Sequence, residues 1–197
     1  MDILLNYFLE LEKLKNTNRY GKYTTSTEHV SDHSFFVCLL SIKLMEEYKL
    51  NLDFKKVVKM SLIHDVCELG LEYDYGAYEA YSDIHIAETK KQYEENKIAF
   101  LSQTFGDNEL AELFEEYEAQ ASEEAKFVKT VDKFETTINI IRDDKIQIAH
   151  GDFTARYSDK YVQNFPTLKP FLREIKLKLK ERYSKSGLIW KSEYDIF

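Results

Sequence analysis

Residues 57–65, VVKMSLIHD, carry an apolar helical stripe that ends in an ionisable pair, His64-Asp65. Val57, Met60 and His64 follow one another by three- and four-residue steps, which align side chains on one face of a helix. We therefore expect the imidazole of His64 to point toward the core. A His-Asp pair offers a nitrogen and a carboxylate oxygen, and borderline divalent metal ions accept both ligand types. The stretch predicts a helix whose end holds a metal ion.

Two more residues of the same chemistry lie on other predicted helices. His33 precedes Val37 at helical spacing, and Asp132 follows Val131 at the margin of another apolar face. A single histidine on such a face is usually a hydrogen-bonded core residue, but a buried aspartate is costly unless it is paired or coordinates a cation. Three helices that each direct a metal-competent group inward therefore favour a metal site.

Apolar residues recur at helical spacing over most of the chain. Glycine occurs six times and proline twice, which is too few for a turn-rich β-sandwich. We predict an all-α fold, with one domain over residues 1–197. Helices are expected over residues 3–15, 31–49, 53–65, 83–105, 108–119, 122–142 and 167–183. Ser31 or Asp32 is expected to cap the second of these, with Phe36, Val37, Leu40 and Leu44 as its buried stripe.

The composition limits the classes of partner. A formal net charge of −8 argues against a nucleic-acid polymer, because phosphate backbones are held by clustered Lys and Arg. The basic run at residues 173–182 alternates with Leu and Ile, which is typical of an amphipathic helix with a solvated face rather than of nucleic-acid or membrane binding. Cys38 and Cys67 lie in apolar surroundings, which predicts buried thiols. No signal peptide or membrane-length apolar run is visible, so we predict a cytoplasmic protein.

Three segments taken together resemble the HD-domain superfamily of metal-dependent phosphohydrolases. They are residues 27–34 (TEHVSDHS), residues 63–68 (IHDVCE), and residues 116–135, which contain EYE and EEAKFVKTVDKFE. The chain is most similar to the branch of HD-domain 5′-nucleotidases that act on deoxyribonucleoside monophosphates. The resemblance covers roughly residues 15–145, and residues 146–197 would be a C-terminal helical extension.

The resemblance implies an HD-domain helical bundle with a single metal site in its core. Its ligands would be His33, His64, Asp65 and Asp132. The cofactor would be one divalent ion, namely Co²⁺, Mn²⁺, Fe²⁺, Zn²⁺ or Mg²⁺, and the sequence does not choose among them.

The resemblance also implies catalytic roles for residues around this site. Glu68, one turn past the His-Asp pair, would orient or deprotonate the attacking water, and Arg19 would bind the substrate phosphate through its planar fork. The family's next acidic residue falls on Tyr73 in this chain. Either Asp74, or Glu72, replaces it after a one-residue shift, or the role is lost in this chain.

The implied activity is that of a phosphomonoesterase. A metal-bound water would attack the phosphate of a (deoxy)nucleoside 5′-monophosphate, so the partner would be a small-molecule phosphate ester. Two alternatives stay open: another phosphate ester as substrate, or a regulatory module that binds metal or nucleotide without hydrolysis, which the altered segment 70–82 would favour. Because the family's members are often dimers, the resemblance also implies a possible homodimer.

Overall fold

The computed structural model describes residues 2–19, 27–71, 77–144, 148 and 150–195. These residues form helices and no strand, apart from one isolated antiparallel bridge between Asn18 and His29, so the all-α prediction is confirmed. The α-helices are α1 (Asp2–Leu11), α2 (Val30–Tyr48), α3 (Phe54–Ile63), α4 (Ala77–Ser82), α5 (Ile84–Phe105), α6 (Asn108–Ala119), α7 (Glu123–Arg142), α8 (Gly151–Arg156), α9 (Asp159–Asn164) and α10 (Lys169–Lys185). Short 3₁₀ turns are η1 (Glu12–Asn16), η3 (Val66–Glu68), η4 (Pro166–Leu168) and η5 (Ser192–Tyr194).

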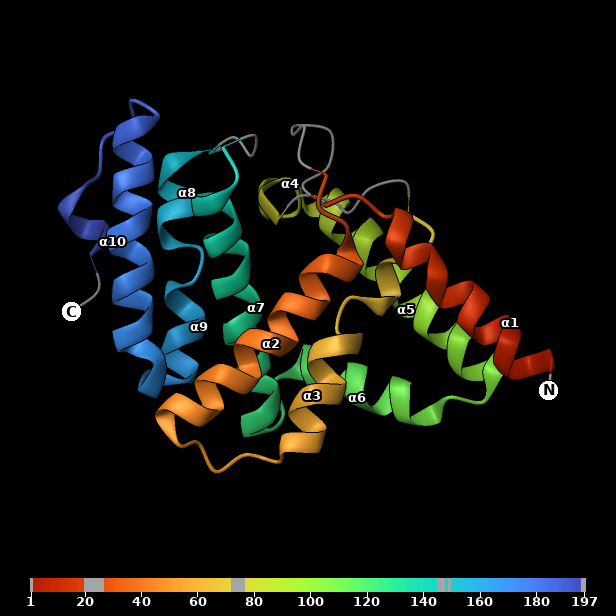
Figure 1. Cartoon of the computed structure of the whole chain (residues 1–197). Coiled ribbons are helices and arrows are strands. Elements are labelled where there is room, and N and C mark those ends of the chain that lie inside the picture. The colour runs from red at the N-terminus through yellow and green to blue at the C-terminus, as the bar shows by residue number, and fades with distance from the viewer. Residues whose placement is uncertain (1, 20–26, 72–76, 145–147, 149, 196–197) are drawn as a thin grey trace.

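Helix α7 is the centre of the bundle. It packs against α2, α3 and α6 on one side and against α9 and α10 on the other, as Figure 1 shows. Its expected apolar stripe is real, because Phe127, Val131 and Phe134 are fully buried and Ile138 and Ile141 pack against the core. A polar residue on this helix can therefore be enclosed by protein on all sides.

A second cluster of buried side chains lies between η3, α5 and α6. Cys67, Leu69 and Leu101 are among its members, and α1 packs against it through Tyr7 and Leu11. In this way α1 lies along α5 on the opposite side of the molecule from α10 (Figure 1). Both cysteines are free and buried, as the sequence predicts.

The start of α2 differs from the sequence-based prediction. The helix begins at Val30, and its N-cap is His29 rather than Ser31 or Asp32. Asp32 instead occupies the third helical position, where its Oδ2 accepts the backbone N–H of His29 at 3.0 Å. This reciprocal arrangement is a capping box. It fixes the first turn of α2, from which His33 projects.

The predicted buried stripe of α2 is wrong at one residue. Val37 and Leu44 are buried and Leu40 is partly buried, but Phe36 is 51% exposed. Neighbouring residues on an α-helix point about 100° apart, so a helix that directs Val37 at α7 turns Phe36 toward solvent. The helix expected over residues 3–15 likewise buries only one of two neighbouring apolar residues. Tyr7 and Leu11 face the protein, whereas Phe8 is exposed.

None of the helices in the described ranges is both long enough and apolar enough to cross a lipid bilayer. Both α2 and α7 contain charged and polar residues between their apolar ones. Their apolar sides are used for packing against one another instead.

We predict that Phe134→Ala lowers the free energy of unfolding by about 3–5 kcal/mol, because it leaves a cavity in the fully buried face of α7. Phe54→Ala is the matched control, since Phe54 is 56% exposed and its loss should change stability by about 0.5 kcal/mol or less. Urea denaturation followed by circular dichroism measures both. Equal losses in the two variants would contradict this assignment of the core.

Candidate metal centre

His64 lies at the C-cap of α3, where the chain leaves the helix. Its side chain is buried, and its Nδ1 lies 2.9 Å from the backbone oxygen of Ser61. An N–H at Nδ1 can donate to that carbonyl, which leaves the lone pair of Nε2 directed into the protein. Hydrogen bonding of one ring nitrogen is the usual way in which proteins orient a metal-binding histidine.

His33, on α2, has no solvent exposure and meets His64 in the interior. Its Nε2 lies 3.3 Å from His64 Nε2 and 3.3 Å from Asp132 Oδ1, while its Nδ1 lies 2.5 Å from Glu135 Oε2. Burial and Arg19 disfavour the imidazolium, but the hydrogen bonds with Asp132 and Glu135 prevail and raise the pKa of His33 to about 9. A proton and a metal ion therefore compete for His33 Nε2.

Asp132 reaches the same point from α7. It is almost fully buried, its Oδ2 accepts the Tyr117 hydroxyl at 2.7 Å, and Lys133 Nζ lies 2.8 Å from the same oxygen. Burial by itself would raise the pKa of Asp132, but the neighbouring Lys133 ammonium and His33 hold it well below its usual range. The carboxylate is therefore charged inside the protein.

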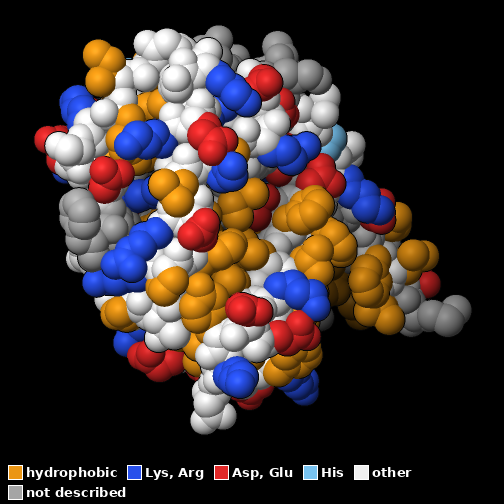
Figure 2. Space-filling model, turned by 60° about the vertical axis from the view of Figure 1, so that its left-hand side comes forward, with side chains coloured by type: hydrophobic (Ala, Val, Ile, Leu, Met, Phe, Trp, Pro, Cys, Tyr) orange, Lys and Arg blue, Asp and Glu red, His pale blue; other side chains and the backbone are white. Residues whose placement is uncertain are grey.

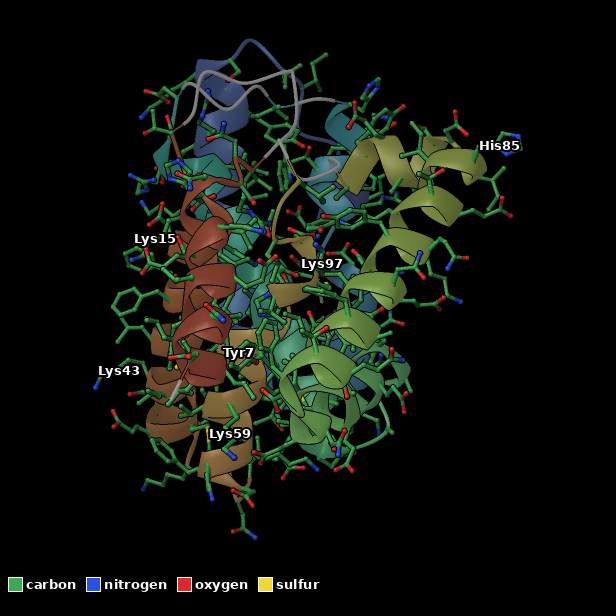
Figure 3. The ribbon with its side chains drawn as sticks, turned by 90° about the vertical axis from the view of Figure 1, so that its right-hand side faces the viewer. Tyr7, Lys15, Lys43, Lys59, His85 and Lys97 are labelled. Atoms are coloured by element: carbon green, nitrogen blue, oxygen red, sulfur yellow. The ribbon has the colours of Figure 1, made fainter. Side chains whose placement is uncertain are left out.

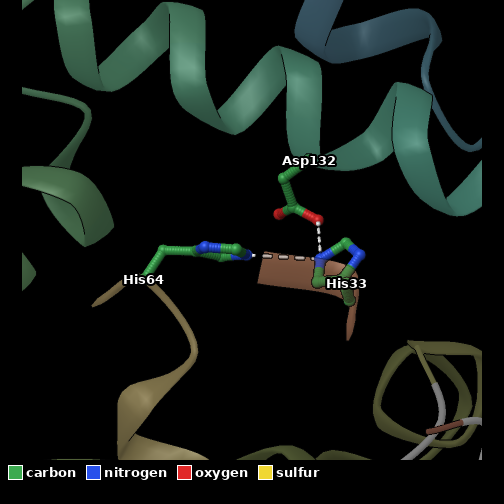
Figure 4. A group of neighbouring side chains, drawn as sticks. All are labelled: His33, His64 and Asp132. Atoms are coloured by element: carbon green, nitrogen blue, oxygen red, sulfur yellow. Dashed lines mark hydrogen bonds and ion pairs between the residues drawn. The ribbon is translucent and has the colours of Figure 1, made fainter. Parts of the chain in front are cut away.

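His33, His64 and Asp132 together form the only group of potential metal ligands found among the described residues (Figure 4). One donor atom from each lies within 4.8 Å of the others. Two imidazole nitrogens that face each other at 3.3 Å repel unless a proton or a cation lies between them. The donor set of two nitrogens and one carboxylate oxygen, enclosed by protein, fits a divalent cation.

Asp65 lies beside this triad. Its Oδ2 is 3.3 Å from His64 Nε2 and 3.6 Å from His33 Nε2, and it accepts a hydrogen bond from Arg19 Nη1 at 3.0 Å. Burial opposes ionisation, but His64, His33 and Arg19 hold the pKa of Asp65 well below its usual range. The fourth residue expected from the sequence therefore lies next to both imidazoles and is partly engaged by Arg19.

Arg19 is brought to the site by backbone pairing just before α2. Its N–H donates to Glu28 O at 3.0 Å, and Val30 N–H donates to Thr17 O at 3.0 Å. The guanidinium is buried, and its Nη2 lies 3.5 Å from Thr136 Oγ1 on α7. A residue far from the metal ligands in sequence thus faces them in space.

Glu68 lies in η3, directly after the His-Asp pair. It is buried, and its Oε1 accepts a hydrogen bond from Lys90 Nζ of α5 at 2.8 Å. Asp74 and the alternative Glu72 lie outside the described residues, as does Tyr73. Of the expected catalytic residues, Arg19 and Glu68 lie within the described part of the chain, and both line the same cleft as Asp65 and Asp132.

That cleft has a volume of about 1200 Å³ and opens to solvent. The cations Lys90 and Lys133 line it together with Arg19, and many of its other lining residues come from α4, α8 and α9. A cleft of this size can accept a small organic molecule together with a phosphate group. The positive side chains around the triad favour an anionic ligand.

Three partner residues are not predicted from the sequence: Glu135 and Tyr117, which contact the ligands His33 and Asp132, and Lys90, which contacts Glu68. Glu135 follows Asp132 by three residues, so the helical step was a usable signal. Tyr117 and Lys90 come from α6 and α5, and their contacts depend on how these helices pack. No local pattern in the sequence reports that packing.

Comparison with known proteins shows which family these features belong to. The family model of the HD domain matches residues 11–174. This chain belongs to the HD domain family. The family implies a divalent metal ion, and the buried cluster of His33, His64 and Asp132 could hold one.

Named relatives of this HD domain protein include 5′-deoxynucleotidases. It is 31% identical over 154 residues to the 5′-deoxynucleotidase HDDC2 of Xenopus laevis, which covers 75% of this chain and 73% of that protein. It is 29% identical over 181 residues to HDDC2 of Homo sapiens, which covers 87% of this chain and 84% of that protein. The expected resemblance to this branch is confirmed.

Two solved structures share the HD domain fold. One is described as a predicted metal-dependent phosphohydrolase from Magnetospirillum magnetotacticum, with 20% identity, a TM-score of 0.72 and coverage of 96% of this chain and 95% of the other. The second is a protein from Pyrococcus horikoshii, with 21% identity, a TM-score of 0.71 and coverage of 88% and 99%. At this level of identity the comparison supports the fold.

We predict that His64→Ala and Asp132→Ala each abolish stoichiometric binding of Mn²⁺ or Co²⁺, because each variant removes one donor of the triad. Elemental analysis after dialysis against the metal measures this. His85→Ala is the control, because His85 lies on the outside of α5 and points away from the site (Figure 3), and it should keep the full metal content. Unchanged metal content in the triad variants would show that the ion binds elsewhere.

Proposed function

We propose that this protein is a metal-dependent phosphomonoesterase that releases phosphate from deoxynucleoside 5′-monophosphates. One observation carries the proposal: Asp132 of the buried triad lines a single cleft together with Asp65, Arg19 and Glu68. The cations Lys90 and Lys133 line the same cleft. The relatives named 5′-deoxynucleotidase support the same substrate class.

We assign His33, His64, Asp65 and Asp132 as the metal-binding residues. The donor atoms of His33, His64 and Asp132 already converge, and the carboxylate of Asp65 is adjacent to both imidazoles. Two nitrogens with two carboxylates favour Mn²⁺, Co²⁺, Fe²⁺ or Zn²⁺ over the oxygen-preferring Mg²⁺. When bound, such an ion supplies positive charge that can lower the pKa of water from about 15.7 to about 7.

Arg19 is assigned to the phosphate. Its guanidinium donates to Asp65, lies beside Thr136 and lines the cleft, so it can meet phosphoryl oxygens that bind next to the metal-binding residues. A planar guanidinium can pair with two phosphate oxygens, which holds the phosphorus in one orientation. Arg19 thus orients the ester and offsets the charge that develops on its oxygens.

Glu68 is assigned as the group that orients the attacking water and accepts its proton. The carboxylate is enclosed by protein, and the Lys90 ammonium at 2.8 Å favours its ionised form. An ionised carboxylate can take a proton, whereas a protonated one cannot. Lys90 is therefore a positioning residue for Glu68 in this proposal.

We predict metal-dependent release of phosphate when deoxynucleoside monophosphates are supplied with Co²⁺ or Mn²⁺. Glu68→Gln should lower kcat by about 10²- to 10⁴-fold, the usual contribution of a general base, while metal content stays the same. Glu88→Gln is the matched control, because Glu88 lies exposed on α5 and should keep full activity. Phosphate release measured colorimetrically decides the question. Tight nucleotide binding without turnover would favour the regulatory alternative, and turnover of unrelated phosphate esters only would favour another substrate.

We propose further that the protein forms a homodimer through the exposed apolar faces of α1 and α2. Figure 2 shows a broad band of hydrophobic side chains on one face of the molecule, and large apolar patches on soluble proteins often mark interfaces. An uncharged face can pair with a second copy of itself by two-fold symmetry. The exposed hydrophobic residues of these helices are Ile3, Leu4, Leu5, Phe8, Leu9, Phe35, Phe36 and Leu39.

The dimer is tested by light scattering coupled to size-exclusion chromatography. We expect the unaltered protein to elute as a dimer and Phe35→Glu with Phe36→Glu to elute as a monomer, since the charges would be buried without partners. Phe54→Glu places the same change on an exposed residue of α3 and should remain dimeric. A monomeric unaltered protein would contradict the proposal.

We also assign the protein to the cytoplasm. Cys38 and Cys67 are both buried free thiols. Reducing compartments keep cysteines in that state, whereas secreted proteins usually pair them.

A further inference from the structure

A continuous array of aromatic rings lines the cleft and joins α4 to α8. The Tyr78 ring stacks on His150 with centroids 3.5 Å apart and meets the edge of Phe153 at 5.3 Å. Phe153 also contacts Tyr81 at 5.1 Å and Tyr157 at 5.3 Å. All five residues line the cleft. We call this array, Tyr78, Tyr81, His150, Phe153 and Tyr157, the aromatic wall.

The aromatic wall does not serve the hydrophobic core. None of its members belongs to the clusters of buried side chains found among the described residues. Tyr81 is 76% exposed, which leaves a large apolar ring in contact with water. His150 adopts a left-handed backbone conformation with φ of 53°, which is strained for a residue other than glycine. Strain and exposure of this kind are typical of binding sites rather than of packing.

The aromatic wall is connected to the candidate metal centre. The Tyr157 ring lies 5.4 Å from Lys133 Nζ, and this ammonium lies 2.8 Å from Asp132 Oδ2. A molecule with its phosphate at the triad would therefore extend past Lys133 and along the aromatic wall.

We propose that the aromatic wall is the nucleobase subsite of this enzyme. The inference rests on the proposed function. It names the residues that would bind the base, at the end of the substrate opposite the phosphate. A flat π-system stacks on aromatic rings whatever its hydrogen-bonding edge, so the wall would accept several bases. Stacking of this kind is typically worth about 5- to 150-fold in affinity per base. The phosphate would be recognised by charge and the base by stacking, at two ends of one cleft.

The test compares two phosphate esters that differ only in the base. Deoxyadenosine 5′-monophosphate carries one, and 2-deoxyribose 5-phosphate does not. For the unaltered enzyme we expect kcat/KM to be at least tenfold higher with the nucleotide. Phe153→Ala should lower the ratio of the two kcat/KM values by about 5- to 50-fold, mainly through KM for the nucleotide. Phe153→Tyr keeps a stacking ring and should restore the ratio.

Two controls separate stacking from a structural effect. Phe54→Ala removes an exposed ring on α3, outside the cleft, and should leave the ratio unchanged. Thermal unfolding of Phe153→Ala should match that of the unaltered protein. If Phe153→Ala lowers both kcat/KM values equally, or leaves the ratio unchanged, the subsite assignment is wrong although the phosphatase activity stands.

A binding experiment tests the subsite when hydrolysis is not available as a readout. Deoxyadenosine, which has no phosphate, is titrated by calorimetry into the unaltered protein and into Phe153→Ala. We expect binding to the unaltered protein that weakens at least fivefold in the variant. Absence of phosphate release together with this binding would overturn the proposed function and support the subsite. Deoxyadenosine binding that is equal in the two proteins would overturn the subsite.

Discussion

Two imidazole nitrogens, His33 Nε2 and His64 Nε2, face each other at 3.3 Å, and both side chains are buried. Unscreened, their lone pairs repel, and the charged Asp132 beside them would be expensive to bury alone. A shared cation removes both penalties at once, and the hydrogen bonds with Asp132 and Glu135 raise the pKa of His33 to about 9. The surrounding polar network, from Glu135 to Tyr117, satisfies the remaining hydrogen-bonding atoms of these ligands. Much of the architecture around the triad can be understood as support for this one arrangement.

Helix α7 makes that support possible because it is enclosed by other helices on both sides. Its buried surface carries the core residues Val131 and Phe134 and also the charged residues Asp132 and Glu135. Packing of Val131 and Phe134 fixes the helix in place. The carboxylates of Asp132 and Glu135 are therefore held in position. The stability of the fold and the geometry of the site therefore depend on the same twenty-residue element.

The sequence predicted the helical class and the convergence of the ligand-bearing helices because both follow from local periodicity and from residue chemistry. Val57, Met60 and His64 share a face whatever the rest of the chain does. Periodicity cannot tell which of two apolar faces is turned to the core, and for this reason Phe36 was assigned to the wrong side. It also cannot report contacts between helices distant in sequence, such as Lys90 with Glu68. The replacement of the family's acidic residue by Asp74 stays a prediction, because that segment lies outside the described residues.

The groups assigned to bond-breaking and those assigned to choosing a ligand come from different stretches of the chain. The triad is borne by α2, the end of α3 and α7, whereas the rings on the far side of the cleft come from α4 and from α8 and the residues that flank it. Apart from Tyr157, which lies against Lys133, substitutions in the second group leave the buried charges and their hydrogen bonds untouched. Descendants of this protein could in that way acquire new preferences by small changes at the periphery, while the ancestral reaction is inherited intact.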